Sequence, residues 1–196
     1  MKKFNPKKTQ ILDTAARLLA EKGHSLFSMR NVSRECKIHL KTLQYYFPTK
    51  RTLLNEVLDY VLQQYYSELN AKFSRASENM NADEMLTSFV EYTFTNNQSK
   101  FVNHFYPALW AMALHDKETA VAMDRTYTLH RQSIEKMVSA VNPKLTPRVV
   151  ALRAAIITAA TEAMMILVGE GKPKHKELTG LKKELVKQCM LIAKSQ

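Results

Sequence analysis

The sequence predicts an all-α protein in which a small N-terminal helix-turn-helix domain is joined by a long helix to a larger helical domain. Three observations support this prediction. Gly occurs only four times and Pro six times in 196 residues, so the residues that punctuate β-hairpins are scarce. Apolar residues recur three and four positions apart along most of the chain, which is the period of an amphipathic helix. Three short helical patterns fit within the first fifty residues, whereas the later patterns are longer.

The first fifty residues contain the pattern of a helix-turn-helix. Asn5-Pro6 is typical of a helix start, because Asn can cap the helix and Pro is favoured at its first position. Ser28 is placed to cap a second helix over residues 29–36, and residues 39–47 form a third helix that ends before a proline. Two short helices joined by a tight turn, the second led by polar residues, predict a motif whose second helix can enter the major groove of B-DNA.

Six further helical patterns follow, which brings the expected total to about nine. Thr49 is placed to cap a long helix, whose length makes it a rigid connector to the rest of the chain. Asn81 and Glu84 form a capping-box pattern at the start of the next helix. The last four helices are expected over residues 101–113, 120–141, 147–167 and 181–192. The expected domains are therefore residues 1–50 and residues 51–196.

Positive charge is concentrated in the first domain. The chain has a formal net charge of +11, and residues 1–50 hold eleven basic against three acidic side chains. The remaining residues hold 18 basic and 15 acidic side chains, so they are much closer to neutral. A small, strongly basic segment suggests a polyanionic partner such as nucleic acid or an anionic membrane. A charge excess that serves solubility is the alternative explanation.

Side chains of the third predicted helix are the candidates for contact with base edges. Lys41 suits guanine acceptors, Gln44 suits adenine, and the methyl group of Thr42 suits thymine. His39, at the start of this helix, can contact either a base or the backbone. For Lys41 the alternative is a charge that is merely solvated.

A second group of side chains is expected to contact the DNA backbone. Arg30 and Lys50 lie at the starts of the second and fourth helices, where positive side chains and exposed N–H groups attract phosphate. Tyr45 and Tyr46 can donate hydrogen bonds to phosphates through their hydroxyls while their rings pack on the sugars. For Tyr46, packing against the first or fourth helix is an equally good alternative.

Residues 11–58, "ILDTAARLLAEKGHSLFSMRNVSRECKIHLKTLQYYFPTKRTLLNEVL", resemble the N-terminal DNA-binding domain of the TetR family of repressors. That domain usually has an Ile-Leu-x-x-Ala-Ala first helix, a Gly after it, and a Gly-Thr-Leu-Tyr-Tyr-His-Phe-x-x-Lys third helix. The resemblance covers about a quarter of the chain. The residues in register with the pattern are Ile11, Leu12, Ala15, Ala16, Gly23, Thr42, Leu43, Tyr45, Phe47, Lys50 and Leu54.

The chain also departs from the family pattern, mostly on the surface that would face DNA. Because the core positions are kept, the departures leave the predicted fold intact, but an operator sequence typical of the family does not follow. The departures are Lys41 for Gly, Gln44 for the first Tyr, Tyr46 for His, Cys36-Lys37 for Ala-Gly before the turn, and His39 where Ser or Thr often caps the helix.

The resemblance implies a homodimeric repressor that binds a double-stranded DNA operator. One helix-turn-helix reads only a few base pairs, so useful specificity generally requires two domains held at half-site spacing. In the eighth helix small residues permit close approach of a partner, and the ninth helix offers a second apolar seam. The expected dimer residues are Ala155, Ala159, Ala163, Leu181, Leu185, Cys189 and Ile192. Packing of both faces inside one subunit is the alternative.

The resemblance further implies a pocket for a small, largely apolar effector in residues 51–196, which would release the repressor from DNA. Methionine and aromatic residues are abundant there, and such a lining suits adaptable apolar ligands. The expected pocket residues are Phe89, Phe105, Tyr106, Trp110, Tyr127, His130, Glu162 and Met165, with His130 and Glu162 as polar anchors. Each of these residues could instead belong to the ordinary core. His130 and Glu162 could also be satisfied by a hydrogen bond in the core or could face the dimer interface.

Enzymatic activity is not expected. The sequence has no Gly-rich phosphate loop, no HExxH, no Cys/His metal spacing and no nucleophile elbow, so neither catalytic residues, a metal nor a cofactor is predicted. Cys36 and Cys189 lie far apart, which is typical of a reduced compartment. The start "MKKFNPKKTQ" lacks the apolar core of a signal peptide, and the apolar run over residues 154–168 is too short for a membrane span. We therefore expect a cytoplasmic protein without a membrane partner.

Two rival functions remain open at the level of sequence. One is a DNA-binding regulator that has no small-molecule pocket and acts constitutively or under the control of a protein partner. The other is a basic helical protein of the membrane surface, which would explain the charge but not the ordered helix-turn-helix pattern. Binding to anionic lipid would weaken with added salt but show no sequence preference, whereas DNA binding would show both properties.

Overall fold

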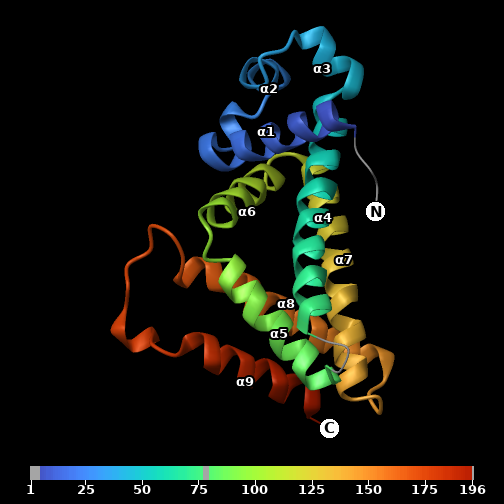
Figure 1. Ribbon diagram of the computed structural model, residues 1–196, viewed down its shortest axis with the longest axis vertical. Helices are drawn as coiled ribbons and strands as arrows, with labels where there is room; N and C mark the ends of the chain where they lie inside the picture. Colours follow the sequence, from blue (N-terminus) through green and yellow to red (C-terminus); the bar gives the residue numbers. More distant parts are fainter. Residues whose placement is uncertain (1–4, 77–79, 196) are drawn as a thin grey trace. The chain divides into compact units, whose positions relative to one another are not determined.

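The structure is a computed structural model that describes residues 5–76 and 80–195, and within them it contains nine α-helices and no strand (Figure 1). An all-α fold of about nine helices, as predicted, is thereby confirmed. The α-helices are α1 (Pro6–Lys22), α2 (Met29–Glu35), α3 (Leu40–Tyr46), α4 (Lys50–Ala76), α5 (Ala82–Asn96), α6 (Lys100–Ala113), α7 (Lys117–Val141), α8 (Pro147–Leu167) and α9 (Leu181–Lys194), with short 3₁₀ helices η1 (His24–Leu26) and η2 (Lys176–Leu178).

The described residues form two compact units. Unit 1 comprises residues 5–67 and 101–126, and unit 2 comprises residues 68–76, 80–100 and 127–195. Helices α4 and α7 each run through the boundary, so both contribute to the two units. This division differs from the expected boundary at residue 50, because α6 and the start of α7 pack with the first three helices.

The core of unit 1 explains that difference. Val32, Leu43 and Phe47, which face inward from α2 and α3, are completely buried. Phe105 and Leu109 of α6 belong to the same apolar cluster and are equally buried. Three short helices of fewer than fifty residues cannot bury much apolar surface by themselves, so α4 and α6 complete the core of the helix-turn-helix.

Side-chain caps begin several helices where the sequence predicts them. Asn5 Oδ1 accepts a hydrogen bond from the Lys7 N–H at 2.9 Å, and Ser28 Oγ accepts one from the Asn31 N–H at 3.2 Å. At the start of α5, Asn81 and Glu84 each accept a hydrogen bond from the backbone N–H of the other, at 3.0 and 2.9 Å. These bonds satisfy N–H groups that have no acceptor within their helix.

Unit 2 is built around α5, which packs against both α8 and α9, while α8 and α9 also pack against each other. The Asn97 side-chain amide donates to the Thr161 carbonyl oxygen at 2.9 Å, and this buried bond ties the end of α5 to the middle of α8. A long connection, drawn in orange in Figure 1, leads from α8 through η2 to α9.

Candidate nucleic-acid interface

Helix α3 has one apolar face and one polar face. Leu43 and Phe47, at its buried side, have no exposed surface. Lys41, Thr42 and Gln44 are exposed, and their spacing places them on the opposite side of the helix. The sequence-predicted base-contacting residues therefore lie together on one outward surface, which the buried residues hold against the core of unit 1.

The turn between α2 and α3 is closed by backbone hydrogen bonds. The N–H of Lys37 donates to the carbonyl oxygen of Arg34, and the N–H of Ile38 donates to that of Ser33, each at 3.0 Å. This is the Schellman pattern of helix termination, which needs a left-handed residue after the helix. Lys37 has that conformation, with φ of 53°, and is the one non-glycine residue with positive φ among the residues that the structure describes.

The two tyrosines at the end of α3 have different environments. Tyr45 is 82% exposed, so its ring and hydroxyl are accessible from solvent. Tyr46 is partly buried and packs against the apolar cluster of unit 1. Their rings meet edge to face, with centroids 5.3 Å apart. The structure thus favours the packing alternative for Tyr46 and keeps Tyr45 available for contact with a partner.

The start of α4 combines a cap with a positive side chain. Thr49 Oγ1 accepts a hydrogen bond from the Thr52 N–H at 3.1 Å, and Thr52 Oγ1 accepts one from the Thr49 N–H at 3.0 Å. Lys50 is exposed, and its Nζ lies 5.9 Å from the centre of the Phe27 ring. The neighbouring Arg51 forms an ion pair with Glu118 of α7 at 2.9 Å. Lys50 therefore presents an exposed positive charge at the start of α4, and the same charge helps to lower the pKa of Asp116.

Arg30 and His39, the two other expected contact residues, are also exposed. Arg30 lies in the first turn of α2, and His39 precedes α3 without making a capping hydrogen bond from its side chain within the described part of the chain. All eight expected DNA-contacting residues except Tyr46 are exposed, and they come from α2, α3 and the start of α4 in unit 1.

The expected dimer residues fall into two groups. Ala155, Ala159 and Ala163 of α8 are exposed. Leu185 and Cys189 of α9 are buried inside unit 2, while Leu181 and Ile192 are half-buried. Leu185 and Cys189 thus pack within the subunit, whereas Leu181 and Ile192 keep part of their surface exposed. The reason is that α9 turns its apolar side towards α5 and α8.

An exposed apolar stripe runs along α8. It consists of Ala151, Leu152, Ala155, Ile156, Ala159, Ala163, Ile166 and Leu167. The residues expected from the sequence did not include its large members, although the high proportion of apolar residues in this helix was the available signal. Among the described residues, α8 is also the one helix that is long and apolar enough to cross a membrane. The apolar run expected over residues 154–168 is thus most of a longer helix, which begins at Pro147.

The eight expected pocket residues are divided between the two units. Phe105, Tyr106 and Trp110 lie on α6 in unit 1, where Phe105 is part of the core. The other five are in unit 2, namely Phe89, Tyr127, His130, Glu162 and Met165. Phe89 and Met165 are buried there.

The polar members of the unit 2 group include a hydrogen-bonded pair. The Tyr127 hydroxyl donates to Glu162 Oε2 at 3.2 Å. Burial raises the pKa of Glu162 from 4.5 to about 7, although the bond from Tyr127 acts in the opposite direction. Burial, with a smaller effect of the Arg131 charge, lowers the pKa of the His130 side chain to about 4. His130 is therefore neutral at physiological pH, and its ring lies 5.7 Å from that of Phe89.

The fold and the surface of α3 together define a helix-turn-helix domain whose second helix presents polar side chains to solvent. Residues 11–57 match the family model described as "Bacterial regulatory proteins, tetR family". The match covers about a quarter of the chain and identifies residues 11–57 as a DNA-binding domain of the TetR type.

Individual proteins resemble this chain less closely than the family model does. The chain is 33% identical over 86 residues to the uncharacterized HTH-type transcriptional regulator YuxN of Bacillus subtilis, and the match covers 43% of this chain and 30% of that protein. A crystal structure described as a TetR-family regulator from Rhodococcus sp. has a TM-score of 0.77 and 15% identity, over 95% of this chain and all of the other. AibR in complex with isovaleryl coenzyme A and operator DNA has a TM-score of 0.65 and 16% identity, over 95% and 97% of the two chains. At such identities the solved structures show a shared fold alone.

Proposed function

We propose that the protein is a dimeric transcriptional repressor that inserts α3 into the major groove of its operator. The observation that carries this proposal is the outward surface of Lys41, Thr42 and Gln44, which lies opposite the fully buried Leu43 and Phe47. A rigidly held helix with hydrogen-bonding side chains on its free face meets the requirement for reading base edges. The positive charge of residues 1–50 supplies the attraction to phosphate that does not depend on sequence.

The backbone contacts come from residues around α3. Lys50 at the start of α4, Arg30 in α2 and the exposed Tyr45 are suited to phosphate oxygens, since each presents a donor to solvent. The N–H groups of Lys50 and Arg51 add to the attraction at Lys50, because they have no acceptors within the helix, whereas that of Thr52 is capped by Thr49. Lys41, Thr42 and Gln44 then determine sequence preference, with His39 beside them.

A homodimer supplies the second half-site contact. Exposed apolar stripes are unusual on monomeric soluble proteins, and the one on α8 combines small residues with Leu152, Ile156 and Ile166. A second copy of the chain would cover this stripe and exclude water from it. This explanation of the apolar helix requires no membrane and fits a cytoplasmic regulator.

Release from the operator follows from a ligand that prefers a conformation unable to bind both half-sites. The free energy by which such a ligand prefers that conformation is also the free energy by which it weakens DNA binding. Support for a ligand in unit 2 comes from the half-buried Tyr127–Glu162 pair and from the relative AibR, whose structure contains both isovaleryl coenzyme A and operator DNA. Because α4 and α7 contribute to both units, a change around Tyr127 can be transmitted to the DNA-binding unit.

Selection of bound sequences from a random DNA pool tests operator recognition. We expect an enriched motif made of two related half-sites whose separation corresponds to one helical turn or a multiple of it. Binding that falls steeply with salt but enriches no sequence would contradict the proposal and favour an interaction with polyanions in general.

The effector step is tested separately, once the selected operator is known. Operator affinity is measured with and without short-chain acyl coenzyme A thioesters and small apolar acids at saturating concentrations. We expect at least one compound to weaken DNA binding. Equal affinities across the panel would instead support a regulator that acts constitutively or with a protein partner.

A further inference from the structure

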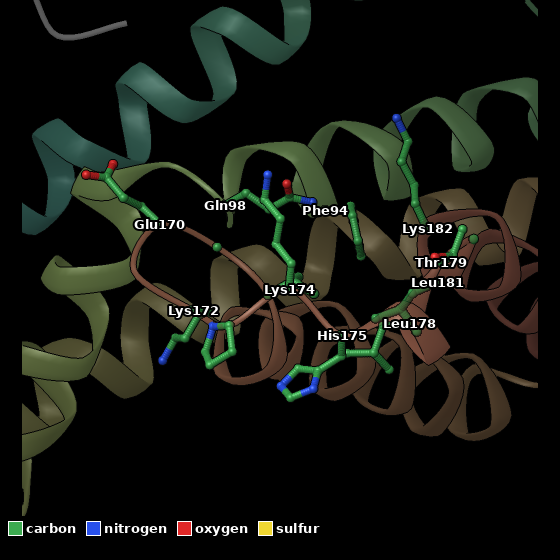
Figure 2. A pocket seen from close by; sticks show the side chains of 14 residues that line it. Phe94, Gln98, Glu170, Lys172, Lys174, His175, Leu178, Thr179, Leu181 and Lys182 are labelled. Carbon is green, nitrogen blue, oxygen red and sulfur yellow. The ribbon is translucent and has the colours of Figure 1, made fainter.

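Unit 2 contains a cavity of about 460 Å³ at the connection between α8 and α9 (Figure 2). It is lined by Phe94 and Gln98 at the end of α5, by the connection itself, and by the first residues of α9. None of the eight residues expected in the effector pocket lines it. Its volume is within the range of sites that hold small molecules.

The backbone of the connection gives the cavity its form. The Glu170 N–H donates to the Gln98 carbonyl oxygen at 3.2 Å, so the start of the connection is tied to the end of α5. Gly171 and Gly180 have φ of 77° and 87°, a left-handed conformation that other residues rarely adopt. These glycines turn the chain away from α8 and then back into α9, and the cavity lies between the two turns.

Three lysines make the cavity electropositive. Lys172, Lys174 and Lys182 line it, and none has a carboxylate within 4 Å among the residues that the structure describes. The one carboxylate in the lining, Glu170, lies 3.9 Å from the ammonium group of Lys100. Because the lysine charges are not compensated locally, an anion would gain attraction without first displacing a carboxylate.

The cavity also has an apolar side. Phe94 is only 5% exposed, and Leu178 and Leu181 are half-buried beside it. Figure 2 shows Lys174 directed towards Gln98 next to Phe94, with Lys172 and Lys182 on opposite sides. Lys174, Gln98 and Phe94 therefore bring a cationic, an amide and an apolar group together in one part of the cavity.

We propose that this cavity binds a small amphiphilic anion, in which a phosphate or carboxylate group is attached to an apolar group. Lys174 would hold the anionic group, while the apolar group would lie against Phe94. The amide of Gln98 and the first N–H groups of α9, which no side chain of the described residues caps, offer further donors. The inference does not depend on operator recognition, since the site can be examined in the absence of DNA.

Calorimetric titration of the full chain with hexyl phosphate, without DNA, tests the proposal. We expect saturable binding of one molecule per chain to the wild type and an affinity about tenfold lower for Lys174→Gln, the effect of losing one charge-assisted hydrogen bond. The variant Lys136→Gln is the matched control, because it removes an exposed lysine of α7 that does not line the cavity. We expect it to bind like the wild type, and circular dichroism verifies that both variants fold.

Further ligands separate the contributions of charge and of apolar contact. Hexanol should not bind measurably, and inorganic phosphate should bind more weakly than hexyl phosphate. The proposal is overturned if hexyl phosphate does not bind, if Lys174→Gln and Lys136→Gln have the same affinity, or if hexanol binds as well as the anion. Binding to phosphatidylglycerol vesicles without binding to free hexyl phosphate would likewise overturn it, because the lysines would then serve a membrane surface.

Discussion

The Tyr127 hydroxyl on α7 donates a hydrogen bond to the Glu162 carboxylate on α8, with 3.2 Å between the two oxygens. Despite this bond, burial raises the pKa of Glu162 from 4.5 to about 7. Between these two pH values the folded protein therefore holds a proton that the unfolded chain has released. The contribution of this group to stability consequently falls as the pH rises from about 4.5 to above 7.

Replacement of Glu162 by Gln should thus stabilise the protein at high pH. We expect Glu162→Gln to increase the free energy of unfolding at pH 8 by on the order of 2 kcal/mol and to change it little at pH 4.5. Gln cannot ionise, yet its carbonyl oxygen can still accept the hydrogen bond from Tyr127. Urea denaturation at the two pH values, at one fixed protein concentration, provides the measurement.

The exposed Glu91 of α5 provides the control, since Glu91→Gln changes a carboxylate of the same unit that lies in solvent. Its effect on stability should be small at both pH values. A gain for Glu162→Gln that is the same at pH 4.5 and pH 8 would show that the carboxyl is not the source of the pH dependence.

Replacement of Lys37 by Gly should stabilise the helix-turn-helix. Lys37 has a φ of 53°, and a left-handed conformation is costly for any residue with a Cβ atom. Gly removes that cost but gains freedom in the unfolded chain, so we expect a net increase of about 0.5–1 kcal/mol in the free energy of unfolding. Lys37→Ala keeps the Cβ atom and should bring no comparable gain. Equal stabilisation by both variants would attribute the effect to the lost charge.

Lys41 and Lys50 should have different roles in operator binding. We expect Lys41→Ala to relax the preference at one base position, at a cost of about 1–3 kcal/mol for the preferred base. Lys50→Ala should weaken binding to all sequences alike and reduce the dependence of affinity on salt by about one phosphate contact. Affinities for single-base variants of the operator at several salt concentrations measure both effects. The reverse pattern would exchange the roles of the two residues.

Local patterns in the sequence predict the helices well because the signals act within a few residues. The caps at Asn5, Ser28 and Asn81 lie where the sequence places them, and Leu43 and Phe47 are buried as their spacing predicts. The exposed row on α3 follows from the same spacing. These features depend on hydrogen bonds between residues close in sequence and on the apolar and polar faces of single helices. The local sequence is therefore sufficient to predict them.

Features that depend on contacts between distant segments were not predictable in this way. Periodicity shows that Cys189 lies on an apolar face of α9 but not whether that face meets α5 or a second subunit, and the structure buries it inside unit 2. The assignment of Phe105 to the core of unit 1 likewise depends on how α6 packs. The cavity around Lys174 forms only when the α8–α9 connection meets the end of α5, although the lysines and glycines of that connection are visible in the sequence.

A charge on the outer face of α8 should separate the proposed dimer into monomers without unfolding it. Ile156 is 53% exposed in the single chain, so Ile156→Glu introduces no buried charge into the monomer, whereas it would place a carboxylate in a dry interface of the dimer. Sedimentation measures the mass in solution. As a control, Val121→Glu alters a residue of α7 that is 64% exposed and should leave the dimer intact. A dimer that persists in Ile156→Glu with unchanged affinity would exclude this face from the interface.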